Sequence, residues 1–135
     1  MAFTENPIGV ALVVCERVII EDQTKNKTLV SIFNNISVRG FPCRHDRLCV
    51  YVALTNGQGS SKISLVLKVI EDGSKVFSAD GQVDFQDVHQ TVEVIFNIRD
   101  FMFYKAGAYA FEVYAGDEYV FENRFTVNLV GPGGR

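Results

Sequence analysis

The stretch Leu48-Cys49-Val50-Tyr51-Val52-Ala53-Leu54 decides the fold, because a large aliphatic side chain stands at every second position. Successive side chains of a β-strand point to opposite faces of its sheet, so this alternation predicts a strand with one face on a core. Residues 10–20 are apolar on both faces, which predicts a central strand that is either covered on both sides or shared between sheets. The period of two returns in four later segments, at 63–69, 92–98, 109–115 and 121–129.

Turn-forming pairs separate the predicted strands, at Asn56-Gly57, Asp72-Gly73, Asp80-Gly81 and Gly116-Asp117. A tight turn needs a positive φ, which glycine adopts without strain. No segment shows a helical period over more than one turn, which excludes a fold of alternating strands and helices. We therefore predict an all-β fold, a single antiparallel β-sandwich of about eight strands that is immunoglobulin-like in the general sense.

The chain of 135 residues has the length of one domain, which we expect to span 1–135, with a core from about 9 to 130 and loose termini at 1–8 and 131–135. Hydrophobic residues make up 47% of the sequence, which excludes a disordered protein. The net charge of −3 and the isoelectric point of about 5.3 argue against nucleic acid as a partner. No apolar run has the length of a membrane-spanning helix or the flanks of a signal peptide, so we expect a cytoplasmic protein without membrane insertion.

The three cysteines, Cys15, Cys43 and Cys49, form no Cys-x-x-Cys motif. Cys15 and Cys49 lie in predicted strands, so we expect buried, reduced thiols, although Cys43 and Cys49 could in principle form a bridge. We predict neither a metal site nor a cofactor, because the cysteines and the two histidines lack the spacing of metal ligands.

Gly107-Ala108-Tyr109 stands just before the last predicted hairpin. In immunoglobulin-like sandwiches, a tyrosine at the start of the penultimate strand bonds its hydroxyl to backbone a few residues upstream, a contact called the tyrosine corner. We therefore assign Gly107 and Tyr109 a structural role. The chain contains no Trp, which excludes an antibody-type domain.

Four motifs follow one another along the chain: a strand ending in Cys15-Glu16, the segment Leu29-Val30-Ser31-Ile32-Phe33-Asn34-Asn35-Ile36, the pair Phe41-Pro42, and a closing Gly107-x-Tyr109-x-Phe111. Their order resembles a family of small, uncharacterised bacterial all-β proteins that is known only as a domain of unknown function. The resemblance covers residues 10 to 129 and implies a β-sandwich and a bacterial source. The chain departs from the family at Ser31, where glycine is expected, and at Ala106, where proline commonly precedes the glycine. No activity is attached to the family, so the resemblance transfers no functional residue.

Phe101-Met102-Phe103-Tyr104 is the most hydrophobic segment that we expect to be irregular. Four large apolar side chains in a row cannot all face one core in an extended chain. Either the segment caps the open end of the sandwich, or one or two rings remain exposed for a partner. In the second case Phe103 and Tyr104 are the strongest candidates.

Arg39, Arg44 and Arg47 lie close together in sequence and predict a small basic patch. Such a patch suits electrostatic docking to another protein, including head-to-tail self-assembly. The overlapping stretch Cys43-Arg44-His45-Asp46-Arg47 places a thiol two residues from an imidazole, but no third group is evident to orient them. We expect a solvated polar loop there and predict no catalytic residue.

The sequence favours a non-catalytic protein-interaction or assembly module, and not an enzyme, because no catalytic constellation is evident. A protein partner or self-association is the expected mode of action. The alternative is a small-ligand, carbohydrate or Ca²⁺-binding sandwich, which the aromatic residues and the acidic turns support. Those acidic residues are Asp80, Asp84, Asp87, Asp100, Asp117 and Glu118, and they form no regularly spaced calcium loop.

Overall fold

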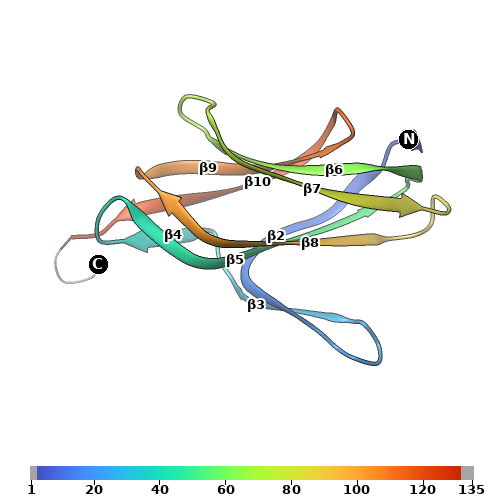
Figure 1. Ribbon diagram of the computed structural model, residues 1–135, viewed down its shortest axis with the longest axis horizontal. Coiled ribbons are helices and arrows are strands. Elements are labelled where there is room, and N and C mark those ends of the chain that lie inside the picture. The colour runs from blue at the N-terminus through green and yellow to red at the C-terminus, as the bar shows by residue number, and fades with distance from the viewer. Residues whose placement is uncertain (1–2, 132–135) are drawn as a thin grey trace.

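The computed structural model describes residues 3–131 and contains ten β-strands in two sheets (Figure 1). One sheet consists of β1 (Phe3–Glu5), β4 (Asn35–Val38), β6 (Gln58–Val69), β7 (Lys75–Phe85), β9 (Gly107–Ala115) and β10 (Glu118–Leu129). The other consists of β2 (Ile8–Ile20), β3 (Lys27–Ile32), β5 (Cys43–Thr55) and β8 (Val92–Phe103). None of the described residues is helical, so the predicted all-β sandwich is confirmed, with ten strands where about eight were expected.

The four-stranded sheet has the order β3-β2-β5-β8, and its neighbouring strands run antiparallel. In the other sheet the order is β6-β9-β10-β4, and β1 and β7 both pair with β6. One pair departs from the predicted antiparallel pattern, since β4 runs parallel to β10 with Asn35 opposite Thr126. The reason is that the chain crosses between the two sheets after β3 instead of turning back in a hairpin.

Part of the N-terminal segment that we expected to be loose is paired. Phe3 and Glu5 of β1 lie opposite Gly59 and Gln58 of β6, and β2 begins at Ile8. Pro7, between β1 and β2, is buried, whereas Gly131 at the other end lies outside any strand and is exposed. Residues 1–2 and 132–135 of that expectation lie outside the described residues.

The core lies between the sheets, where the alternation predicts it. In β5, Val50, Val52 and Leu54 are buried, and four fully buried phenylalanines fill the space between the layers: Phe85, Phe103, Phe111 and Phe125. The ring of Phe125 stacks on those of Tyr109 and Phe111, with 5.6 Å between centroids in both pairs. Burial of each such aromatic side chain contributes about 1.5–3 kcal/mol to folding.

β7 is longer than its sequence pattern indicates. We expect a turn at Asp80-Gly81, and this prediction is wrong, because β7 continues through both residues. Gly81 is needed for a different reason: a Cβ at this position would lie 3.3 Å from Cγ1 of Val94 in β8. The missing side chain therefore lets β7 and β8, from opposite sheets, approach each other closely.

Tyr109, at the start of β9, makes the contact of a tyrosine corner. Its buried hydroxyl donates a hydrogen bond of 2.7 Å to the backbone oxygen of Lys105, four residues upstream. Gly107 between them has a φ of 136°, which favours glycine. Together these two residues fix the turn that carries the chain from β8 into β9.

Replacing Tyr109 by phenylalanine should lower the free energy of unfolding by about 1–2 kcal/mol, because the Lys105 oxygen loses its donor while the ring stays in place. Urea denaturation of both proteins measures the difference. Tyr104→Phe is the matched control, since the side chain of Tyr104 is exposed. Equal losses in the two variants would contradict a stabilising role for the Tyr109 hydroxyl.

β2 and β3 continue beyond the sandwich as a two-stranded hairpin, residues 16–31, which we call the arm. The pairing of β2 with β5 ends at Cys15, and from there β2 pairs with β3. Ser31 has a φ of 56°, a value that favours glycine, the residue that the family resemblance leads one to expect there. This kink redirects the hairpin, and Figure 1 shows the arm leaving the sandwich beneath the four-stranded sheet.

Candidate functional site

The segment 101–104 is the end of β8 and the residue after it, and not the irregular stretch expected from sequence. Phe103 is 1% exposed, Met102 is half-buried, and Tyr104 is 71% exposed. Phe103 is therefore a core residue, which corrects the expectation that its ring is available to a partner. Tyr104 has the exposure that a binding residue needs.

A kink at Asp100 divides the apolar side chains of this strand. Asp100 has a φ of 54°, and both it and Arg99 are exposed, so the alternation of buried and exposed positions shifts by one residue. Phe101 and Phe103 then turn toward the core, and Met102 lies opposite Arg44 of β5. Because of this shift, the rings of Phe101 and Phe103 both face the core, although two exposed residues, Arg99 and Asp100, directly precede them.

An apolar pocket of about 390 Å³ lies at the end of the sandwich where β8 ends and β7 begins. Its lining consists of Val69, Ser74, Val76, Phe101, Met102, Tyr104, Lys105 and Tyr109. Phe77 packs edge-on against Phe101, with 6.0 Å between ring centroids, and supports this wall. The volume lies within the range of pockets that hold a small molecule or an anchoring side chain.

The polar rim of the pocket carries Lys105 between two acidic residues. Its Nζ lies 3.5 Å from Asp72 and 3.6 Å from Glu71. The pKa of Lys105 is raised, chiefly by the charge of Asp72, and the pKa of Asp72 is lowered, chiefly by the backbone N–H of Ser74. The positive charge of Lys105 and the negative charges of Asp72 and Glu71 offset one another, so the rim presents no strong field of one sign.

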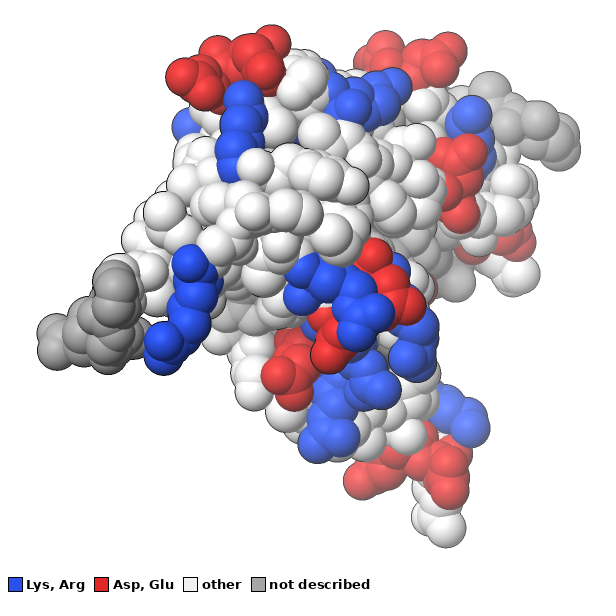
Figure 2. Space-filling model, turned by 60° about the vertical axis from the view of Figure 1, so that its left-hand side comes forward, with Lys and Arg blue, Asp and Glu red and all other residues white. Residues whose placement is uncertain are grey.

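The three predicted arginines are exposed, and two of them, Arg44 and Arg47 of β5, line one open pocket together with Glu16, His45 and Asp46. Arg44 lies 3.3 Å from Asp46 and 3.8 Å from Asp100, which offset its charge. Arg47 lies opposite Arg99 of β8, and no ion pair joins Arg39 or Arg47 to another of the described residues. On the face shown in Figure 2, basic and acidic side chains lie interleaved.

The stretch 43–47 is the first part of β5, which corrects the expectation of a polar loop. His45 is half-buried between Phe33 and Phe103, with centroid distances of 6.0 and 6.4 Å. The imidazole therefore packs against aromatic rings, and Cys43 lies opposite Phe103 in the neighbouring strand.

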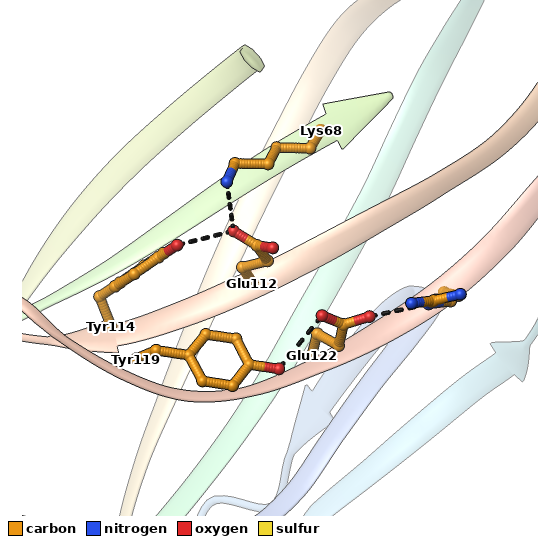
Figure 3. Close-up of polar contacts among 6 residues, drawn as sticks. Lys68, Glu112, Tyr114, Tyr119 and Glu122 are labelled. Carbon is orange, nitrogen blue, oxygen red and sulfur yellow. Dashed lines mark hydrogen bonds and ion pairs between the residues drawn. The ribbon is translucent and has the colours of Figure 1, made fainter. Parts of the chain in front are cut away.

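The outer face of the six-stranded sheet carries a polar network that the sequence pattern did not reveal (Figure 3). Glu112 accepts hydrogen bonds from Lys68 at 3.0 Å and from the hydroxyl of Tyr114 at 2.8 Å. On β10, Glu122 likewise accepts from Arg124 at 2.7 Å and from Tyr119 at 3.1 Å. The hydrogen bond with Glu112 raises the pKa of Lys68, and the hydrogen bond from Arg124 lowers the pKa of Glu122. Each carboxylate therefore has two partners within the network.

A second network fastens the arm to the four-stranded sheet. Lys27 of the arm lies 2.5 Å from Glu93 of β8, and the same carboxylate accepts a hydrogen bond from Tyr51 of β5. The hydrogen bonds from Lys27 and Tyr51 lower the pKa of Glu93, while burial and the neighbouring Glu93 raise the pKa of Tyr51 to about 12. The charged form of Glu93 therefore stabilises the docked arm.

Acidification should release the arm. Because the pKa of Glu93 lies below its usual 4.5, its contribution is present above that value and is lost as the pH falls through the lower value of the folded protein. Hydrogen exchange of the arm amides, measured between about pH 6 and about pH 3, should show growing exposure after correction for the intrinsic rate. In Glu93→Gln the arm should be equally exposed at both pH values, and a wild-type pH dependence in that variant would exclude Glu93 as the cause.

A family model described as a family of unknown function, DUF6941, matches residues 10–128. The chain belongs to the DUF6941 family. The resemblance noted in the sequence is thereby confirmed in its main point, that the chain belongs to a family of unknown function. No curated protein matches this DUF6941 chain.

Solved structures share the fold of this DUF6941 domain over most of its length. A β-glucosidase of Listeria innocua in complex with glucose is similar to 93% of the chain, with a TM-score of 0.53 and 12% sequence identity. β-glucosidase 3B of Thermotoga neapolitana in complex with α-D-glucose also matches over 93%, with a TM-score of 0.53 and 15% identity. The chain spans only 16% of each enzyme, so the likeness shows a β-sandwich fold and nothing about activity.

Residues 3–131 contain no group of three or more His, Cys, Asp or Glu side chains placed to hold a metal ion. Within the same range, no helix could cross a membrane.

Proposed function

We propose that this domain is a non-catalytic interaction module that holds a protein partner at the apolar pocket around Met102 and Tyr104. The observation that carries the proposal is the exposure of Tyr104, 71%, at the mouth of a pocket with an apolar lining. Large aromatic side chains and methionine are enriched at the centres of protein interfaces. The free thiols of Cys15, Cys43 and Cys49 suit a reducing compartment, and we place the protein in the bacterial cytoplasm.

The position of the pocket supports a binding role. β7 and β8 approach closely at Gly81 and Val94, whereas the pocket lies where β7 begins and β8 ends. Val76, on the β7 side, is also exposed, so apolar groups from both strands face the opening. An apolar side chain entering there would be removed from water on several sides, which is what a binding hot spot requires.

Site-specific photocrosslinking tests the proposal. A photoreactive phenylalanine analogue replaces Tyr104 in the full chain, produced in its native host, and Tyr119 is the matched control because it is a similarly exposed tyrosine on β10. We expect a discrete protein adduct from position 104 and none from 119. Met102→Asp, which places a charge in the pocket, should abolish the adduct.

Two results of the crosslinking experiment would overturn the proposal: no adduct at position 104, or the same adducts at positions 104 and 119. A shift in melting temperature with Ca²⁺ or with a panel of saccharides, together with no adduct, would favour the ligand-binding alternative instead.

A further inference from the structure

Cys15 of β2 and Cys49 of β5 lie directly opposite each other in the antiparallel register. Opposed Cα atoms in such a ladder are about 4.5 or 5.5 Å apart, and both spacings fall within the roughly 4.4–6.8 Å that disulfides span. The sequence suggested Cys43 and Cys49 as the pair that could bridge. The register brings Cys15 to Cys49 and places Cys43 opposite Phe103.

Both thiols are enclosed, although Cys15 of β2 and Cys49 of β5 alternate with the core residues Val14 and Val50 and so face away from the core. Cys15 is 0% exposed and Cys49 1% exposed. The thiol of Cys15 donates to the backbone oxygen of Arg17 at 3.4 Å, and the backbone of Val30 also bonds to it, so both strands of the arm cover it. The thiol of Cys49 donates to Oδ1 of Asn97 at 2.9 Å.

We propose that Cys15 and Cys49 are a redox pair that hydrogen peroxide converts to a reversible cross-strand disulfide when the arm opens. This inference goes beyond the interaction function and is independent of the pocket. Two steps balance the reaction: one thiol reacts with hydrogen peroxide to give a sulfenic acid and water, and the second thiol displaces water from it to form the disulfide. In sum, two thiols lose two hydrogen atoms and one peroxide becomes two water molecules.

Geometry predicts that the bond is reducible. Opposed Cβ atoms lie about 4.5–5.5 Å apart, whereas a disulfide holds them roughly 3.5–4.5 Å apart, so β2 and β5 must move slightly together. A strained disulfide is reduced more readily than a relaxed one. The bond would also replace the hydrogen bonds of both thiols, to Arg17 and to Asn97, and so alter the base of the arm.

The test uses the full chain with Cys43→Ser, which removes the half-buried third thiol. The variant is treated with hydrogen peroxide under native conditions, its remaining thiols are blocked, and intact mass and peptide mapping follow. We expect the loss of two hydrogen atoms, a crosslink between the peptides of Cys15 and Cys49, and full reversal by dithiothreitol. Cys15→Ser and Cys49→Ser in the same background are the matched controls, and neither should crosslink within the chain.

The arm supplies a second readout. Lys27→Met removes the ion pair with Glu93 and should speed disulfide formation about fivefold, which corresponds to the ~1 kcal/mol that one such pair can contribute. No Cys15–Cys49 crosslink in protein whose circular dichroism is native would overturn the pair. A crosslink that forms at the same rate with and without Lys27 would overturn access through the arm.

Discussion

Replacing Phe103 by alanine should lower the free energy of unfolding by about 3–5 kcal/mol, the usual effect of removing a buried aromatic ring. The ring is 1% exposed and lies 5.3 Å from that of Tyr109 and 6.1 Å from that of Phe125, measured between centroids. Its removal leaves a cavity beside the tyrosine corner and breaks these edge-on contacts. Because a domain of this size is typically stable by roughly 5–15 kcal/mol, the loss is a large fraction of the total.

Tyr104→Ala, one residue further along the chain, is the matched control. Its side chain is exposed, so the free energy of unfolding should change by no more than about 0.5 kcal/mol. Chemical denaturation of the two variants measures both values. Comparable destabilisation by the two variants would show that the division between core and surface at 103 and 104 is incorrect.

Phe103 and Tyr104 also illustrate which features of the fold a sequence pattern does and does not predict. The alternation of β5 predicts its buried face residue by residue, because a pleated strand imposes a period of two. The same rule fails at 101–104, because the φ of 54° at Asp100 shifts the alternation and no residue type marks that shift in advance. Aspartate tolerates this conformation better than most residues, but that tolerance does not identify which aspartate adopts it.

The register between paired strands is a second feature that the sequence pattern does not predict. The pairing of Cys15 with Cys49, and that of Arg47 with Arg99, depends on how strands far apart in sequence align, and single-strand patterns do not fix that alignment. The arm was missed for a related reason. Residues 10–20 read as one central strand, yet β2 pairs with β5 only up to Cys15 and with β3 only from Cys15 onward, so Cys15 alone has a ladder partner on both sides.

Replacing Gly57 by alanine should lower the free energy of unfolding by about 1–3 kcal/mol, the usual effect of overpacking a well-filled core. The turn-forming pair Asn56-Gly57 leads one to expect a positive φ at the glycine, but in the structure Asn56 has the positive φ, 63°. Gly57 is needed for space: a Cβ there would lie 2.6 Å from Cδ2 of Phe85. Phe85 is buried and packs edge-on against Phe3 at 5.9 Å, so its ring has little room to move.

Gly40→Ala is the control for this steric argument, because no atom lies within 4 Å of a Cβ built at Gly40. Its stability should stay within about 0.5 kcal/mol of the wild-type value, measured by the same denaturation experiment. Gly57→Ala combined with Phe85→Leu should recover part of the loss, since the smaller side chain vacates the space that the new methyl group needs. If the double variant is less stable than the sum of the two single changes predicts, contact between position 57 and the Phe85 ring is not the cause of the loss.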